Sequence, residues 1–206
     1  MFKEISYSEA KDFLLPRHYS GRIPSISYAF GYFSENKLLA VCTFGKPASN
    51  ALCKGVCGEE YSDKVFELNR LCRVENINIQ LSKFVAYCLK QLKPLDLIII
   101  ISYSDTAMNH SGYIYQATNW IYTGKTKKRT DKYTEGNKHS RHYDKNVSDE
   151  IRKVRSSKHR YIYFACNRRL KKILLNCLNY NVEEYPKEEN KNYTLGDFLK
   201  PELIYK

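Results

Sequence analysis

A short polar run follows the most aliphatic stretch of the chain. Ser102, Tyr103, Ser104 and Asp105 come directly after Leu95–Ile101, a run typical of a strand buried on both faces. Ligands of such sheets tend to bind beyond the carboxyl ends of strands. A carboxylate there can accept a proton, and a phenol can donate one to a leaving group. The sequence therefore predicts a reactive pocket at this strand end, although Asp105 could instead simply cap a following helix.

Two other places carry side chains suited to such a pocket. His18 and Tyr19 form a polar pair in an early loop, although an isolated histidine is more often a structural hydrogen-bonding group than a ligand. Arg70 interrupts Lys64–Leu71, which otherwise alternates like a strand. An arginine there requires an anionic or planar partner, which a bound ligand or a buried ion pair would supply.

Positive charge is concentrated in one segment. Residues 125–172 hold 17 Lys and Arg against 5 Asp and Glu, whereas the rest of the chain carries 17 of each sign. A neutral body with one basic segment predicts binding to a polyanion such as DNA. A hydrated basic loop is the alternative. The residues expected to contact phosphates are Lys127, Lys128, Arg129, Arg141, Arg152, Lys153, Arg155, Lys158, Arg160, Arg168 and Arg169.

The order of predicted elements indicates an α/β fold in a single domain, residues 1–206. Helices and strands that alternate along the chain favour a mixed sheet with helices on both faces. A basic insertion at about 125–158 precedes the last strand, and a tail at about 181–206 packs on the body. The predicted helices are Ser8–Leu15 (with Ser8 as N-cap), Leu81–Leu92, His110–Asn119 and Asn167–Leu178. The predicted strands are Ser27–Phe33, Lys37–Phe44, Lys64–Leu71, Leu95–Ile101, Trp120–Gly124 and Arg160–Ala165.

Cysteine usage and hydropathy indicate an intracellular protein. The seven cysteines are an odd number at scattered, mostly core-like positions, which favours a reducing compartment. Cys53 and Cys57 lie in a glycine-containing stretch predicted to be a loop, with no second pair at metal-ligand spacing, so we expect free thiols. The N-terminal residues lack the pattern of a signal peptide. The longest apolar run, Leu97–Ile101, is too short to span a bilayer, so no membrane partner is expected.

Several blocks of the sequence together resemble the bacteriophage Mom DNA-modification proteins, over about residues 15–186. The blocks are Arg17–Ser20, Glu67–Leu71, Ser102–Asp105, His110–Ala117, Asn119–Gly124, Lys158–Tyr161 and Tyr185–Lys187. The resemblance implies a fold like that of the GNAT acyltransferases, with a mostly antiparallel sheet. It also implies conversion of adenine in DNA to its N6-carbamoylmethyl form, which shields phage DNA from restriction enzymes in the bacterial cytoplasm.

The resemblance also suggests roles for the candidate residues. Asp105 would hydrogen-bond and help deprotonate the adenine N6 amine, and Tyr103 would donate or position a proton. Arg70 would hold the anionic end of the donor, while His18 and Tyr19 complete the pocket. His18 could ligate a metal such as iron. Because adenine must be flipped out or single-stranded to react, further side chains are expected around the base and donor: Tyr28, Ser82, Ser102, Ser104 and Tyr115.

The expected donor departs from the GNAT pattern. Acyl-CoA enzymes of that fold bind the cofactor pyrophosphate with a glycine-rich turn, whereas the corresponding link, Cys72–Gln80, contains no glycine. Acetyl-CoA is therefore disfavoured as donor, although Ser82 and Lys83 could still hold an anion. Two other functions stay open: a conventional GNAT enzyme that acetylates an amine or a protein, and a noncatalytic DNA-binding protein. Nothing in the sequence indicates an obligate protein partner.

Overall fold

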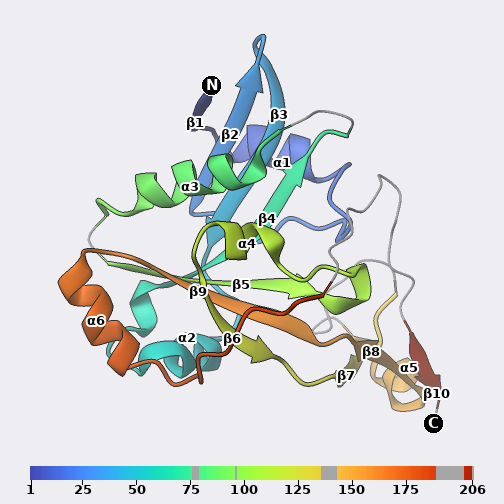
Figure 1. Ribbon diagram of the computed structural model, residues 1–206. Coiled ribbons are helices and arrows are strands. Elements are labelled where there is room, and N and C mark those ends of the chain that lie inside the picture. The colour runs from blue at the N-terminus through green and yellow to red at the C-terminus, as the bar shows by residue number, and fades with distance from the viewer. Residues whose placement is uncertain (76–78, 96, 136–142, 189–201, 206) are drawn as a thin grey trace.

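The centre of the protein is a seven-stranded sheet (Figure 1). The computed structural model describes residues 1–75, 79–95, 97–135, 143–188 and 202–205. Every neighbouring pair of this sheet is antiparallel except β4 with β5, which confirms the predicted mixed, mostly antiparallel architecture. In spatial order the strands are β1 (Phe2–Glu4), β2 (Tyr28–Ser34), β3 (Lys37–Gly45), β4 (Val65–Arg73), β5 (Ile98–Asp105), β9 (Lys158–Ala165) and β6 (Ile121–Lys125).

Helices cover both faces of the sheet, and β5 separates two hydrophobic cores. Ile98 and Ile100 point to the face covered by α3 (Leu81–Leu92) and α4 (Tyr113–Ala117). Ile99 and Ile101 point to the opposite face, against α2 (Asn50–Cys57) and α6 (Arg168–Asn176). α1 (Tyr7–Leu14) packs beside them on β2 and β3. The continuous aliphatic run therefore marks a strand buried on both sides, as predicted.

Some predicted boundaries were wrong. α1 begins after Ser6 rather than Ser8, because the Ser6 hydroxyl accepts from the Glu9 amide while the Glu9 carboxylate accepts from the Ser6 amide. Cys53 and Cys57 lie on a buried face of α2, not in a loop. The helix expected at 110–119 is only α4, since Gly112 starts it in the left-handed region with φ 84°. A 3-10 turn, Ser62–Lys64, precedes β4.

β5 extends to Asp105, so the polar run predicted as a loop is the second half of a strand. Its partner β9 pairs with it along the whole length, from Ile98 opposite Ala165 to Asp105 opposite Lys158. The backbone hydrogen bonds of that ladder fix the polar residues in extended conformation, irrespective of their low hydrophobicity. A 3-10 turn, Thr106–Met108, follows.

The basic insertion contains secondary structure that hydrophobic periodicity did not reveal. A second, three-stranded sheet has the order β10 (Leu203–Tyr205), β8 (Ile151–Arg155) and β7 (Arg129–Lys132), and α5 (Lys145–Glu150) precedes β8. Its strands are rich in charged residues, so no apolar alternation marks them. In Figure 1 this sheet lies beyond the N-terminal end of β9, whereas α6 follows the C-terminal end of that strand.

The chain after α6 returns along the edge strand β6. The Glu183 amide donates to the Tyr122 carbonyl (3.0 Å), and the Tyr185 hydroxyl donates to the Trp120 carbonyl (2.6 Å). These bonds cover an edge that would otherwise expose unpaired backbone groups. None of the helices in the described ranges is long and apolar enough to cross a membrane.

The α6 surface provides a stability test, because two adjacent aliphatic residues of the helix differ in burial. Leu174 is 0% exposed and Ile173 is 43% exposed. We expect Leu174→Ala to lower the free energy of unfolding by about 2–5 kcal/mol, as a buried cavity is formed. Ile173→Ala should cost less than about 1 kcal/mol. Urea titration followed by circular dichroism measures both, and equal losses would contradict the assignment of α6 faces.

Candidate active site

The candidate site lies where β4 and β5 part. The two strands pair in parallel only from Val65 to Glu67, opposite Ile99 to Ile101. Beyond that point β4 stays with β3 and β5 stays with β9, so a gap opens between them. The hydroxyl of Ser102 lies at the start of this gap, hydrogen-bonded to the Leu68 carbonyl oxygen at 2.8 Å. The gap provides a cavity in the middle of the sheet, with walls that the two cores support.

A β-bulge in β4 determines which of its side chains reach the cavity. Two neighbouring residues of β3 face Arg70 and Leu68, so Asn69 is an extra residue in β4. The Asn69 carboxamide accepts from the Thr43 hydroxyl (2.7 Å), which holds the bulge. With one residue inserted, side chains three apart lie on the same side of the strand. Glu67 and Arg70 therefore both line the cavity.

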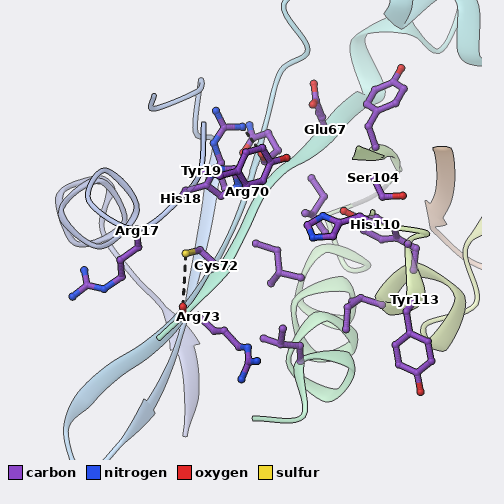
Figure 2. A pocket seen from close by; sticks show the side chains of 18 of the residues that line it. Arg17, His18, Tyr19, Glu67, Arg70, Cys72, Arg73, Ser104, His110 and Tyr113 are labelled. Carbon is purple, nitrogen blue, oxygen red and sulfur yellow. Dashed lines mark hydrogen bonds between the residues drawn. The ribbon is translucent and has the colours of Figure 1, made fainter. Parts of the chain in front are cut away.

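The cavity has a volume of about 430 Å³ and draws its lining from six parts of the chain: residues 17–19, 67–75, 81, 103–104, 110–115 and 158. Figure 2 shows His18, Tyr19 and Arg70 on one side, with Ser104 and His110 facing them from the other. Glu67 lies toward one end, and Arg73 lies at the other. Tyr103, Tyr115 and Lys158 also contribute to the lining. A carboxylate, several cations and aromatic rings thus surround one space large enough for a small ligand.

Two carboxylates line the cavity, the half-buried Glu67 and the exposed Glu75, and the sequence pattern did not predict Glu67 as a site residue. Burial raises the pKa of Glu67 above its ordinary value, while the charges of Arg70 and Lys158 oppose that rise. A carboxylate with a raised pKa binds a proton more strongly and is a better general base than an ordinary one. Glu67 was hidden in the sequence because its inward direction depends on the bulge. The signal that the sequence offered was the spacing of Glu67 and Arg70, an acidic residue and an arginine three residues apart in one predicted strand.

His18 is a neutral hydrogen-bonding group of fixed tautomer. Burial lowers the pKa of His18 to about 3, helped by the charges of Arg70, His110 and Lys158. The Ser20 amide donates to Nδ1 at 3.2 Å, so Nδ1 is an acceptor and the proton of the neutral ring lies on Nε2. The imidazole stacks on Tyr19, with ring centres 4.4 Å apart.

A metal does not fit His18 well. Coordination through Nε2 would move the ring proton to Nδ1, where it would face the Ser20 N–H. Within the described residues, no three His, Cys, Asp or Glu side chains form a group that could hold a metal ion. Iron was suggested by the resemblance alone, and we derive no step through a metal.

The comparisons with known proteins agree with the sequence blocks that converge on this cavity. The family model described as the Mom protein family matches residues 1–187. The chain belongs to the Mom protein family. No curated protein matches it.

Solved structures show the fold of this Mom-family protein. An N-acetyltransferase from Staphylococcus aureus Mu50 is 10% identical, with a TM-score of 0.50, covering 80% of this chain and 98% of that one. The ribosomal-protein-S18-alanine N-acetyltransferase from Escherichia coli is 7% identical, with a TM-score of 0.47, covering 81% and 94%. The first likeness confirms the expected GNAT-like fold, and at 10% identity it shows the fold alone.

Asp105 caps the turn that follows it, which is the alternative that the sequence left open. It does not contribute to the cavity lining, and its oxygens accept from the Ala107 amide (3.0 Å), the Ser156 hydroxyl and Lys158 Nζ (2.9 Å). Burial alone would raise the pKa of Asp105, but Lys158 and these hydrogen bonds outweigh it and lower the pKa. An ionised carboxylate with three donors is a weak base. In this Mom-family protein Asp105 caps the following turn and holds Lys158 at the cavity wall.

The other residues predicted for the pocket occupy three kinds of position: some line the cavity, one lies buried behind it, and two lie elsewhere. Tyr103, Ser104 and Tyr115 line the cavity. Ser102 is fully buried behind it, hydrogen-bonded to the Tyr115 hydroxyl at 2.7 Å. Tyr28 instead packs on Phe66 in the core, and Ser82 lines a second, neighbouring cavity. Sequence spacing could not distinguish these cases, because each depends on which way a strand or helix faces.

The residues predicted to bind DNA do not form one surface. Lys158 begins β9, whereas Arg168 and Arg169 come after its other end. The two ends of the strand are seven residues apart, which corresponds to about 23 Å. Arg160 stacks on Tyr180, with its guanidinium 3.4 Å from the ring centre, and donates to Thr123. Lys127, Lys128, Arg129, Arg152, Lys153 and Arg155 lie on or beside the small sheet, and Arg141 lies outside the described residues.

The ion pair at the cavity wall predicts a stability effect. Asp105→Asn removes the charge that faces Lys158 and should lower the free energy of unfolding by about 3 kcal/mol at pH 7. Because the pKa of Asp105 is lowered on folding, its contribution is present above its ordinary pKa and is lost as the pH falls through the folded value. Adding Lys158→Met to Asp105→Asn should recover part of the loss in thermal unfolding. No recovery would mean that the pair is not the source of the stability.

Glu67 predicts the opposite behaviour. Since its folded pKa lies above the ordinary value of 4.5, ionisation at neutral pH opposes folding. Glu67→Gln should therefore raise the melting temperature at pH 7, whereas the gain should disappear below pH 4.5, where the wild-type carboxyl is protonated in both states. Differential scanning calorimetry across this range measures the difference. A loss of stability at pH 7 would indicate a structural ion pair instead.

Proposed function

We propose that this protein is a DNA-modifying transferase that converts adenine to N6-carbamoylmethyladenine and so protects phage DNA from restriction. The observation that carries the proposal is the convergence of five of the seven Mom-like blocks on one cavity. Glu67 and Arg70 come from β4, Tyr103 from β5, and His18 and Tyr19 from the loop after α1. Membership of the Mom family supports DNA as the substrate.

The cavity suits a purine base that has been flipped out from between its neighbouring bases in DNA. Base-modifying enzymes hold a flipped base between aromatic or apolar surfaces and hydrogen-bond its edge. The stacked rings of His18 and Tyr19 offer such a surface on one wall. On the opposite wall, the buried Ser104 hydroxyl has no hydrogen-bond partner within the described part of the chain. A base edge between these walls would satisfy that hydroxyl.

Glu67 is the group we assign to accept the proton of the N6 amine. As N6 bonds to the methylene carbon of the carbamoylmethyl donor, the leaving group departs with the bonding electrons and N6 loses one proton to Glu67. Burial raises the pKa of Tyr103, so its phenol stays protonated at neutral pH and can donate to the departing group. Arg70 supplies the charge for an anionic donor. Asp105, which sequence analysis had suggested as the base, instead positions Lys158.

Nucleoside mass spectrometry tests this function. DNA from cells that express the wild-type protein should yield an adenosine derivative heavier by one carbamoylmethyl group in place of a hydrogen. Glu67→Gln should reduce its rate of formation by about 10²–10⁴-fold, the usual contribution of a general base. Glu35→Gln makes the same chemical change at the exposed β2–β3 turn and should leave the rate unchanged.

Other outcomes would identify the alternatives. Turnover of acetyl-CoA without DNA would favour a conventional acetyltransferase, the activity named for the structural neighbours. Salt-sensitive DNA binding with no modified nucleoside would favour a noncatalytic DNA-binding protein. Equal rates for Glu67→Gln and wild type would remove Glu67 from the chemistry.

A further inference from the structure

The small sheet has two faces, and its charges differ between them. Arg129 pairs with Arg155 across the β7–β8 ladder, and Asp131 pairs with Lys153. Because side chains alternate along strands, these four lie on one face. The contacts agree, since Arg129 and Arg155 both approach Asp131, at 3.6 and 3.4 Å. Arg152 points to the other face, where it donates to the Thr130 hydroxyl and carbonyl.

The face that bears Lys153 lies toward the cavity. Burial and the charges of Arg155 and Arg22 lower the pKa of Lys153, so Arg22, in the loop before β2, lies close to this strand. The charge of Arg155 also acts on Tyr19, and that of Arg129 acts on Tyr103. Tyr19 and Tyr103 line the cavity. The small sheet thus places its charged face beside the cavity opening.

The backbone fixes this placement from both sides. Arg155 is three residues before the cavity residue Lys158, a reach of at most about 10 Å. Between them, Ser156 donates to Asp105, and the Ser157 carbonyl accepts from Thr106. On the facing side, the Arg22 carbonyl accepts from Arg70 Nη2 at 3.1 Å. Both the end of β8 and the loop that carries Arg22 are therefore tied to residues at or beside the cavity.

Positive charge exceeds negative charge in this group. Among the described residues, Arg129 and Arg155 both contact the carboxylate of Asp131, and the charges of Arg155 and Arg22 act on Lys153. Holding like charges together opposes folding unless an anion binds between them. Phosphate oxygens are the usual partners of such arginine and lysine groups in nucleic-acid complexes.

We infer that Arg22, Lys153 and Arg155 form a binding site for the backbone phosphates that flank the nucleotide whose base enters the cavity. The inference rests on the proposed function, and it specifies which residues contact the DNA backbone. A base that is flipped out leaves its phosphates at the mouth of the pocket. Only one face of the basic sheet takes part, so Arg152, one residue from Lys153, does not.

Adjacent residues of β8 provide matched variants. Lys153→Gln and Arg152→Gln each remove one cation from the same strand, on opposite faces. Their affinities can be measured by fluorescence anisotropy, using a single-stranded pyrimidine oligonucleotide that contains one adenine. Lys153→Gln should reduce the slope of log affinity against log salt by about 0.7, the value for one phosphate contact. Arg152→Gln should leave the slope unchanged, and Arg22→Gln, outside the sheet, should repeat the effect of Lys153→Gln.

A neutral methylphosphonate beside the adenine tests the location of the contact. It should weaken binding by wild type and by Arg152→Gln, but should cause little further loss for Lys153→Gln, because the partner charge is already absent. Equal behaviour of the two β8 variants, or a wild type that does not bind DNA, would overturn the inference. The methylphosphonate and Lys153→Gln could weaken DNA binding non-additively, as expected, while no modified nucleoside forms. That result would support the phosphate site and reject the proposed chemistry.

Discussion

The parting of β4 from β5 after Glu67 is the constraint on which the rest of the site depends. Two strands that share only three paired positions cannot close the sheet between them, and the polar ends of both strands must find partners elsewhere. β3 and β9 supply those partners, and the bulge at Asn69 turns Glu67 and Arg70 to the same side. The cavity is thus built on backbone pairing and supported by two cores, which is a rigid way to position reactive groups.

Two carboxylates near the cavity have pKa values shifted in opposite directions. Burial raises the pKa of Glu67 more than the charges of Arg70 and Lys158 lower it, whereas at Asp105 the charge of Lys158 and three hydrogen bonds outweigh burial and lower the pKa. Environments that separate the pKa values of neighbouring acids commonly divide their roles between proton transfer and charge positioning. In this protein the low pKa of Asp105 is a consequence of the register of β5 on β9, which places Asp105 opposite Lys158.

The sequence was informative where one physical signal dominated. The helical stripe at 81–92 and the aliphatic run before Ser102 predicted α3 and the buried part of β5, and family blocks predicted the GNAT-like fold. The small sheet was not predicted, because its charged strands show no alternation of apolar and polar residues. The direction of Glu67 depends on a bulge, and the neutral tautomer of His18 depends on a loop amide. The bulge is held by Thr43 of β3, and the tautomer by the conformation of the loop from His18 to Ser20, so the residue types alone establish neither.

The position of β10 has a consequence for the order of assembly. Its residues, 203–205, form the outer strand that hydrogen-bonds to β8, whereas the two cores are built from residues up to Leu174. During synthesis the N-terminal part of a chain folds first. The body and its cavity can therefore form on the ribosome before the charged sheet is complete, because the outer strand of that sheet forms only after residue 205 has emerged.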